Sequence, residues 1–256
     1  MLGFIVPIKS KTISKEWDLF SRYVERTIKS ICNQKNLNFK VFVVCHEIPE
    51  TSFVKDNRVT FLQVDFPPPV LGESPKENSV KKEVDKANKI KFGAREAQKE
   101  GISYIMTVDG DDCISNKISG YVNDNGSDSI TGWYVQKGYL YNEGRNYAYL
   151  NLKNFNRVCG SCIIIKPEFF HLMINKNGVF RHGWTDLKGH TLQPFPFPAV
   201  IYSMVNGTNM LMNKEGKQQR KTKLNFFRKK NLTTLIRRIK KYRLVSIKSL
   251  KSEYMI

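Results

Sequence analysis

The sequence lacks the features of a secreted or membrane-spanning protein. Its first residues, Met1 to Lys9, contain neither a basic leader nor a cleavage site. No apolar run approaches the roughly 18 residues that a membrane-spanning helix needs. The five cysteines are an odd number in mostly apolar surroundings, which is typical of reduced thiols in a reducing compartment. We therefore expect a cytoplasmic protein.

Acidic residues are also scarce, and the basic excess is unevenly spread. The chain has 42 Lys and Arg against 23 Asp and Glu, which gives a net charge of +19. Residues 214–256 hold 15 of those cations and only 2 acidic residues, whereas residues 1–213 are mildly basic. A chain of 256 residues is long enough for one α/β domain and an appendage. We therefore predict a domain over 1–213 and a basic tail over 214–256.

Short apolar runs predict the buried strands of an α/β domain. Helical spacing of apolar residues predicts one helix after the first strand and a second over 80–99. This order of elements implies parallel βαβ units. Two aromatic runs, 129–135 and 138–141, are joined by Gln136-Lys137 and predict a β-hairpin. The predicted strands outside the hairpin cover 3–8, 39–45, 59–65, 102–108 and 159–165.

Three carboxylates in four residues follow the strand over 102–108. They belong to Asp109, Asp111 and Asp112. Ligands of open α/β sheets bind at the carboxyl ends of the strands, where this cluster falls. Carboxylates so close repel one another unless a cation or hydrogen bonds balance them, and hard oxygen ligands suit Mg²⁺ or Mn²⁺. The alternative interpretation is a solvated acidic turn.

Cys159-Gly-Ser-Cys162 has the spacing of a redox or zinc motif. It is followed directly by an Ile-rich run, and a structural zinc would need a second such pair, which the sequence lacks. The start of a buried strand is therefore the favoured interpretation.

The basic tail combines cations with an apolar stripe. On a helix, this pattern is typical of a segment that lies on an anionic membrane. A helix packed on the domain and a nucleic-acid-binding arm are the alternatives. The apolar residues of the stripe are Leu232, Leu235, Ile236, Ile239, Tyr242 and Leu244.

Taken together, these elements resemble a GT-A fold glycosyltransferase of the family 2 type. The resemblance covers roughly residues 1–209 and is most specific at Asp109-Gly-Asp-Asp112, which is similar to the Asp-x-Asp motif of that family. It implies a Rossmann-like three-layer sandwich with a mixed, mostly parallel central sheet, here with a basic helical tail. Cys45-His-Glu-Ile-Pro49 departs from the family pattern, in which acidic and small residues at this place bind the donor base.

The resemblance and the chemistry together suggest the roles of individual residues. Asp111 is the first choice of ligand for Mn²⁺ or Mg²⁺, and Asp109 would either bind the ion as well or hold the donor ribose. His182 would be a further ligand, with His190 as a second choice, and Asp186 would be the base of an inverting reaction. Asp65 is a substitute for the missing base-binding residues, Lys91 or Arg95 would reach a phosphate, and Trp133 would stack on a sugar. The complete predicted donor site is Pro7, Ile8, Lys9, Asp65, Lys91, Arg95, Asp109, Gly110 and Trp133.

The leading functional hypothesis is a metal-dependent hexosyltransferase that moves a sugar from a nucleotide-sugar to a glycan or a lipid-linked, lipopolysaccharide-type acceptor. The tail would hold it at the inner face of an anionic membrane. A nucleotidyltransferase is one alternative, although the Gly-rich phosphate loop usual in that class is lacking after the first strand. A nucleic-acid-binding protein would use the same tail but leaves the Asp cluster unexplained, so a nucleic-acid partner is not expected.

Overall fold

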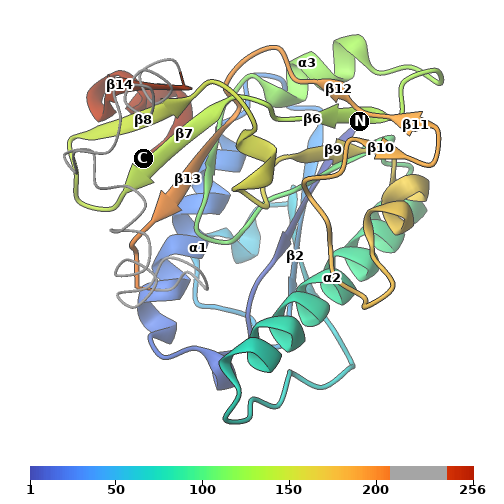
Figure 1. Cartoon of the computed structure of the whole chain (residues 1–256), viewed down its shortest axis with the longest axis vertical. Coiled ribbons are helices and arrows are strands. Elements are labelled where there is room, and N and C mark those ends of the chain that lie inside the picture. Colours follow the sequence, from blue (N-terminus) through green and yellow to red (C-terminus); the bar gives the residue numbers. More distant parts are fainter. Residues whose placement is uncertain (208–240) are drawn as a thin grey trace, which may run out of the picture.

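A computed structural model describes residues 1–207 and 241–256, apart from the side chains of residues 54 and 55. A seven-stranded sheet with the order β12-β6-β9-β4-β1-β2-β3 forms its centre (Figure 1). Only β9 of this sheet runs against its neighbours, so the sheet is mixed and mostly parallel. Its strands are β1 (Leu2–Pro7), β2 (Phe39–Cys45), β3 (Val59–Gln63), β4 (Tyr104–Thr107), β6 (Gly132–Tyr134), β9 (Ile163–Ile165) and β12 (Gln193–Pro194).

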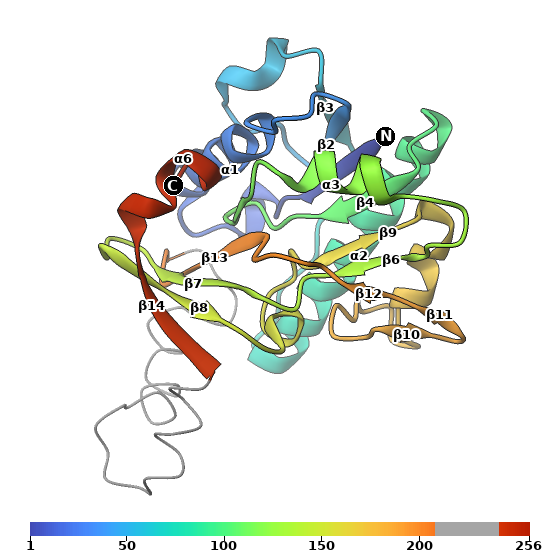
Figure 2. The ribbon, with the colours of Figure 1, turned by 90° about the horizontal axis from the view of Figure 1, so that it is seen from above.

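Helices cover both faces of this sheet. Figure 2 shows α2 (Pro75–Lys99) on one side, with α1 (Trp17–Cys32) and α3 (Ile118–Asn125) on the other. The side chain of Ile5 lies beneath α2 at Gly93, whereas that of Ile8 lies beneath Gly110 on the side of α1. Residues of opposite parity point to opposite faces of an extended chain, which explains this division. The predicted three-layer α/β architecture is confirmed.

A second, five-stranded sheet with the order β14-β8-β7-β13-β5 packs beside α1. It has a small apolar core that includes Cys113, Tyr141, Ile201 and Tyr254. Its strands are β5 (Cys113–Ile114), β7 (Gly138–Asn142), β8 (Tyr147–Asn151), β13 (Val200–Met204) and β14 (Tyr242–Ser246). The remaining elements are η1 (Lys11–Ile13), η2 (Ser52–Lys55), η3 (Phe155–Arg157), η4 (Pro167–Met173), η5 (Ile247–Ser249), α6 (Lys251–Tyr254), β10 (Asp186–Leu187) and β11 (His190–Thr191).

The predicted hairpin over 129–141 is wrong. Its first arm, β6, pairs with β9 in the large sheet, and its second arm, β7, pairs with β8 and β13 in the small sheet. The short connection therefore carries the chain from one sheet to the other. Propensity and turn length gave the strands correctly, but the choice of partner depended on distant strands.

Residues 241–256 also differ from the predicted helical tail. Tyr242 and Leu244 lie in β14, an edge strand that pairs antiparallel with β8, and Tyr254 donates a hydrogen bond to the Pro198 carbonyl at 2.5 Å. This part of the predicted tail therefore packs on the domain. The rest of the tail, residues 214–240, lies outside the described residues. Among the described residues, no helix is long and apolar enough to cross a membrane.

Candidate functional site

The acidic cluster lies between β4 and β5, where the chain passes from the large sheet to the small one. Because β1, β2 and β4 are parallel, their carboxyl ends meet at this edge. The predicted position of the cluster is therefore correct. Its three carboxylates lie in three different environments.

Asp112 is fully buried and enclosed by hydrogen bonds. Its Oδ2 accepts from Ser161 Oγ at 2.5 Å and from the Cys159 thiol at 3.3 Å, and its Oδ1 accepts from the Ser203 backbone N–H at 3.0 Å. Burial and the neighbouring carboxylates of Asp111 and Asp109 raise its pKa well above the usual value. Asp112 therefore ties three parts of the chain together rather than facing a ligand.

Asp111 is 8% exposed and accepts a hydrogen bond from Asn206, which lies two residues after β13. Asn206 Nδ2 donates to its Oδ2 at 2.7 Å. Burial, followed by the charge of Asp109, raises the pKa of Asp111 to about 6, although Asn206, Lys9 and Lys86 act in the opposite direction. Lys9 and Lys86 therefore stabilise the charged form of Asp111.

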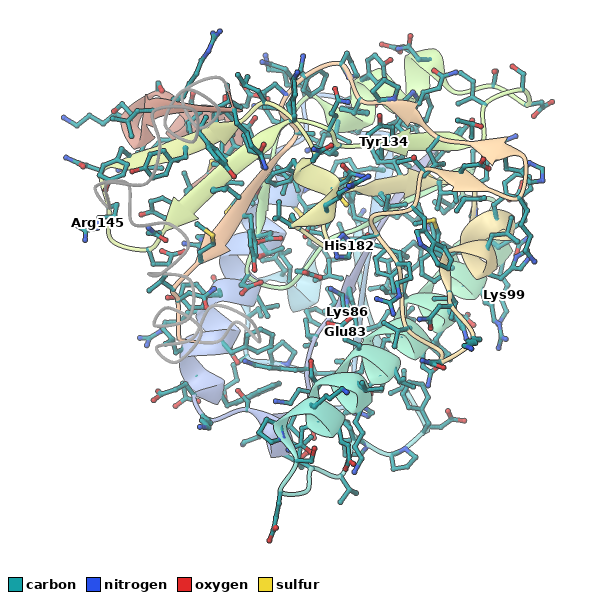
Figure 3. The ribbon with its side chains drawn as sticks, in the orientation of Figure 1. Glu83, Lys86, Lys99, Tyr134, Arg145 and His182 are labelled. Atoms are coloured by element: carbon teal, nitrogen blue, oxygen red, sulfur yellow. The ribbon has the colours of Figure 1, made fainter. Side chains whose placement is uncertain are left out.

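Asp109 is the most open of the three and pairs with Lys86 of α2. The Lys86 Nζ lies 2.5 Å from Asp109 Oδ1, and the two side chains are 19% and 24% exposed. Burial lowers the pKa of Lys86, but the charges of Asp109 and Glu83 outweigh burial and leave it above the usual value. In Figure 3, Glu83 and Lys86 lie on α2 below His182, and Lys99 lies at the C-terminal end of the helix.

The end of β1 forms the floor of the site. Pro7 and Ile8 are buried, and the Ile8 side chain packs beneath Gly110, so these residues support the acidic loop through packing. Lys9 is partly exposed, with its Nζ 4.3 Å from the centre of the Phe20 ring. Burial lowers the pKa of Lys9 to about 8, while Asp111 acts to raise it. Lys9 and Lys86 thus bring cations to the cluster from β1 and from α2.

A second lysine of α2, Lys89, is buried beside the site. Its Nζ donates to Asp85 Oδ2 at 2.7 Å and to the Ile8 carbonyl at 2.8 Å. His46 Nε2 lies 2.9 Å from the other oxygen of Asp85. The departure from the family pattern at Cys45-His-Glu-Ile-Pro49 thus places a histidine in a buried polar network that joins β1, β2 and α2.

The predicted metal ligands do not come together as a ligand set. Among residues 1–207 and 241–256, no three His, Cys, Asp or Glu side chains are grouped so as to hold an ion. Asp109 is paired with Lys86, and His182 Nδ1 donates to the Asn156 carbonyl at 2.5 Å. Burial lowers the pKa of His182, which favours the neutral ring with Nε2 as the acceptor nitrogen. As they stand, the residues do not fit a three-ligand site, and the Mn²⁺ or Mg²⁺ ion stays a prediction.

Asp186 lies in β10, at the start of a tight turn into β11. It is exposed, and its Oδ1 accepts the Gly189 N–H at 3.1 Å, which closes the turn. The adjacent Trp184 is 42% exposed, and His190, the second metal candidate, packs against Phe169 at 4.4 Å between ring centres. The role of Asp186 as a base stays a prediction.

Three predicted donor-binding residues, Trp133, Arg95 and Lys91, lie elsewhere than expected. Trp133 is 1% exposed and packs against Tyr104 and Tyr121, so its ring is not available to a sugar. Arg95 is exposed, and it lies nine residues, or about two and a half helical turns, after Lys86. This places Arg95 on the opposite face of α2, and Lys91 is also rotated away. Asp65, by contrast, is exposed just after the end of β3, as expected, and its part in donor binding stays a prediction.

The structure adds site residues that the sequence reasoning missed. These are Lys86, Ser161, Ser203 and Asn206. Lys86 lies four residues before the buried Ile90, but helical spacing gives only a weak signal for it, because few apolar residues mark the buried face of α2. Asn206 lies within residues 1–209, which the family resemblance covers.

The Cys159-Gly-Ser-Cys162 motif lies immediately before β9 and contacts the acidic cluster. All five cysteines are free, and the two cysteines of this motif are buried. Ser161 Oγ accepts the Asp109 N–H at 2.7 Å and donates to Asp112, and Thr107 Oγ1 donates to the Gly160 carbonyl at 3.1 Å. The motif therefore holds the acidic loop in place.

The chain matches no protein-family model and no curated protein. It is similar in fold to solved structures of S. aureus TarS. For TarS 1–349 in complex with UDP, identity is 11%, coverage 93% of this chain and 78% of that chain, and the TM-score 0.45. For TarS 1–349, identity is 10%, coverage 79% of this chain and 60% of that chain, and the TM-score 0.44. For TarS, identity is 9%, coverage 80% of this chain and 37% of that chain, and the TM-score 0.43. The chain thus spans less than two thirds of the length of two of these three.

Proposed function

We propose that the protein is a glycosyltransferase that uses a nucleotide-sugar donor. The observation that carries this proposal is the grouping of carboxylates and lysines at the carboxyl edge of the parallel strands. Asp109 and Asp111 lie there between Lys86 of α2 and Lys9 after β1. Cations at this edge suit the diphosphate of a nucleotide-sugar, and carboxylates suit its sugar or ribose hydroxyls.

Sugar transfer breaks one bond, forms another and moves one proton. The bond between the anomeric carbon of the sugar and the diphosphate oxygen breaks, and its electron pair stays on the diphosphate. The acceptor hydroxyl oxygen bonds to that carbon and gives its proton to a base. Positive groups fixed beside the diphosphate stabilise the charge that develops there. In an inverting reaction, Asp186 is our candidate for the base.

A screen of nucleotides tests the donor class. The melting temperature would be measured with UDP, GDP, ADP, CDP, TDP and their sugars, with and without Mn²⁺, for wild type and Asp111→Ala. We expect one nucleotide series to stabilise the wild type and to lose most of its effect in the variant. The absence of stabilisation by any nucleotide would contradict the proposal, and tight, salt-sensitive binding of duplex DNA in its place would favour a nucleic-acid-binding protein.

Asp186→Asn tests the base separately. The variant should bind the donor as the wild type does but should transfer no sugar to an acceptor. Because the amide side chain retains an oxygen, it can still accept the Gly189 N–H that closes the turn. An Asp186→Asn enzyme with wild-type transfer would exclude Asp186 as the base.

The acceptor and the membrane form the last part of the proposal. We propose a glycan or a lipid-linked, lipopolysaccharide-type acceptor, reached from an anionic membrane surface through the basic segment 214–240. The support is the sequence pattern of that segment. Replacement of Arg237, Arg238 and Lys240 by Gln should weaken binding to vesicles of anionic lipid while transfer to a soluble acceptor persists. Unchanged vesicle binding would contradict this role.

A further inference from the structure

The Lys86–Asp109 ion pair occupies the place at which the sequence predicts a divalent cation. Asp109 is one of the two carboxylates of the Asp-x-Asp motif, and the Lys86 Nζ lies 2.5 Å from its Oδ1. The pair links α2 to the loop after β4, two elements that both pack in the large-sheet core. A metal ion at Asp109 would have to displace this ammonium or lie against it, and like charges repel.

Gly160 leaves the space in which the pair lies. A Cβ added at this position would lie 2.7 Å from both the Lys86 Nζ and the nearer Asp109 oxygen, Oδ2. A side chain at this position would therefore push the ammonium away from the carboxylate. The Gly160 carbonyl of the Cys159-Gly-Ser-Cys162 motif accepts a hydrogen bond from Thr107 Oγ1, and the next residue, Ser161, accepts the Asp109 N–H with its side-chain Oγ. On the Gly160 side, the space is therefore bounded by backbone that a hydrogen bond fixes, and not by a side chain that could move.

The pair is also partly open, unlike a purely structural ion pair. The Lys86 and Asp109 side chains are 19% and 24% exposed, whereas the Lys89 and Asp85 side chains are 1% and 8% exposed. An ammonium has three donor hydrogens, so Lys86 can bind a phosphate oxygen while it keeps its bond to Asp109.

We propose that the Lys86 ammonium, held by Asp109 in the space left by Gly160, binds the donor diphosphate in place of a divalent cation. Donor binding then does not need Mn²⁺ or Mg²⁺. Asp109 acts as the partner that positions Lys86, and Lys9 adds a second cation from β1. This inference rests on the proposed nucleotide-sugar function and assigns its charge-neutralising group.

Titration calorimetry with UDP, GDP, ADP, CDP and TDP tests the inference, in EDTA and in Mn²⁺. The wild type should bind one of them in EDTA with an affinity within about threefold of that in Mn²⁺. Lys86→Met should weaken this binding about 10- to 100-fold, as expected for loss of a charge-assisted hydrogen bond. Lys86→Arg should restore part of the affinity, and Gly160→Ala should weaken it because the added Cβ displaces the ammonium.

Lys99→Met is the matched control, because Lys99 lies at the far end of the same helix with its side chain 71% exposed (Figure 3). It should bind as the wild type does, and melting temperatures of all variants show whether they fold. Binding that disappears in EDTA and returns with Mn²⁺, or a folded Lys86→Met that binds normally, would overturn the inference but leave the proposed function intact. If no diphosphate binds under either condition, the proposed function fails, and the inference fails with it.

Discussion

Two lysines one turn apart on α2 face the same region and have different surroundings. Lys89 is enclosed, with Asp85 and the Ile8 carbonyl as partners, and it joins the helix to β1. Lys86 pairs with Asp109 across a partly open gap at the acidic cluster. The enclosed pair, Lys89–Asp85, joins elements of the fold where water is excluded. In the partly open pair, Lys86–Asp109, the same kind of ammonium group is accessible to a ligand.

Loss of the enclosed lysine should have the largest effect on stability. Lys89→Met leaves the Asp85 carboxylate buried with His46 as its remaining side-chain partner, which should lower the free energy of unfolding by about 3 to 5 kcal/mol. For a chain of this length, that corresponds to a fall in melting temperature of roughly 10 °C. Lys86→Met should cost at most about 1 kcal/mol, because its pair is partly solvated.

Calorimetric unfolding of both variants measures the two losses of stability directly. Equal losses of stability in Lys89→Met and Lys86→Met would remove the distinction between a structural and a ligand-binding lysine.

A smaller effect is expected where α2 packs on the sheet. A Cβ at Gly93 would lie 2.8 Å from Ile5 Cγ2 and 2.9 Å from Val44 Cγ2. Gly93→Ala should therefore push the helix outward and cost about 1 to 3 kcal/mol. Since the helix carries both lysines, donor affinity should fall as well, which calorimetry of binding and of unfolding can measure in parallel. A more stable Gly93→Ala protein would show that the helix has room to move.

The smallest effect should come from a cation on the other face of α2. Arg95 is exposed and points away from Lys86, so Arg95→Gln should change donor affinity by less than about twofold. A loss as large as that of Lys86→Met would restore the original sequence-based assignment of Arg95 to the donor site.

Much of the large sheet could be predicted from the sequence, because β1, β2, β3 and β4 are local apolar runs bounded by loops. The position of the Asp cluster followed from the same patterns, since a strand end fixes where the next residues lie. The parallel βαβ pairing of β1 and β2 followed from the order of elements, but the partners of the later strands could not be predicted. The pairing of β14 with β8 joins residues 91 to 99 positions apart, and β6 and β7 separate because β6 pairs with β9 and β7 with β8.

The side chains of the site were harder to predict than its place. Aromatic rings stack on sugars, and the sequence therefore suggests Trp133 as a sugar contact, but its two aromatic neighbours bury it in the core. The choice among the lysines of α2 depends on the rotation of the helix about its axis, which the mostly polar sequence of this helix defines poorly. The contact of Lys86 with Asp109 also depends on the gap at Gly160, more than 70 residues away.

The most direct test is an experimental structure with the nucleoside diphosphate that the screen identifies, obtained in the presence of Mn²⁺. We predict that the Lys86 ammonium contacts a phosphate oxygen while it remains bonded to Asp109, with no ion between Asp109 and Asp111. A Mn²⁺ ion that bridges these carboxylates and the diphosphate, with Lys86 turned away, would contradict the account.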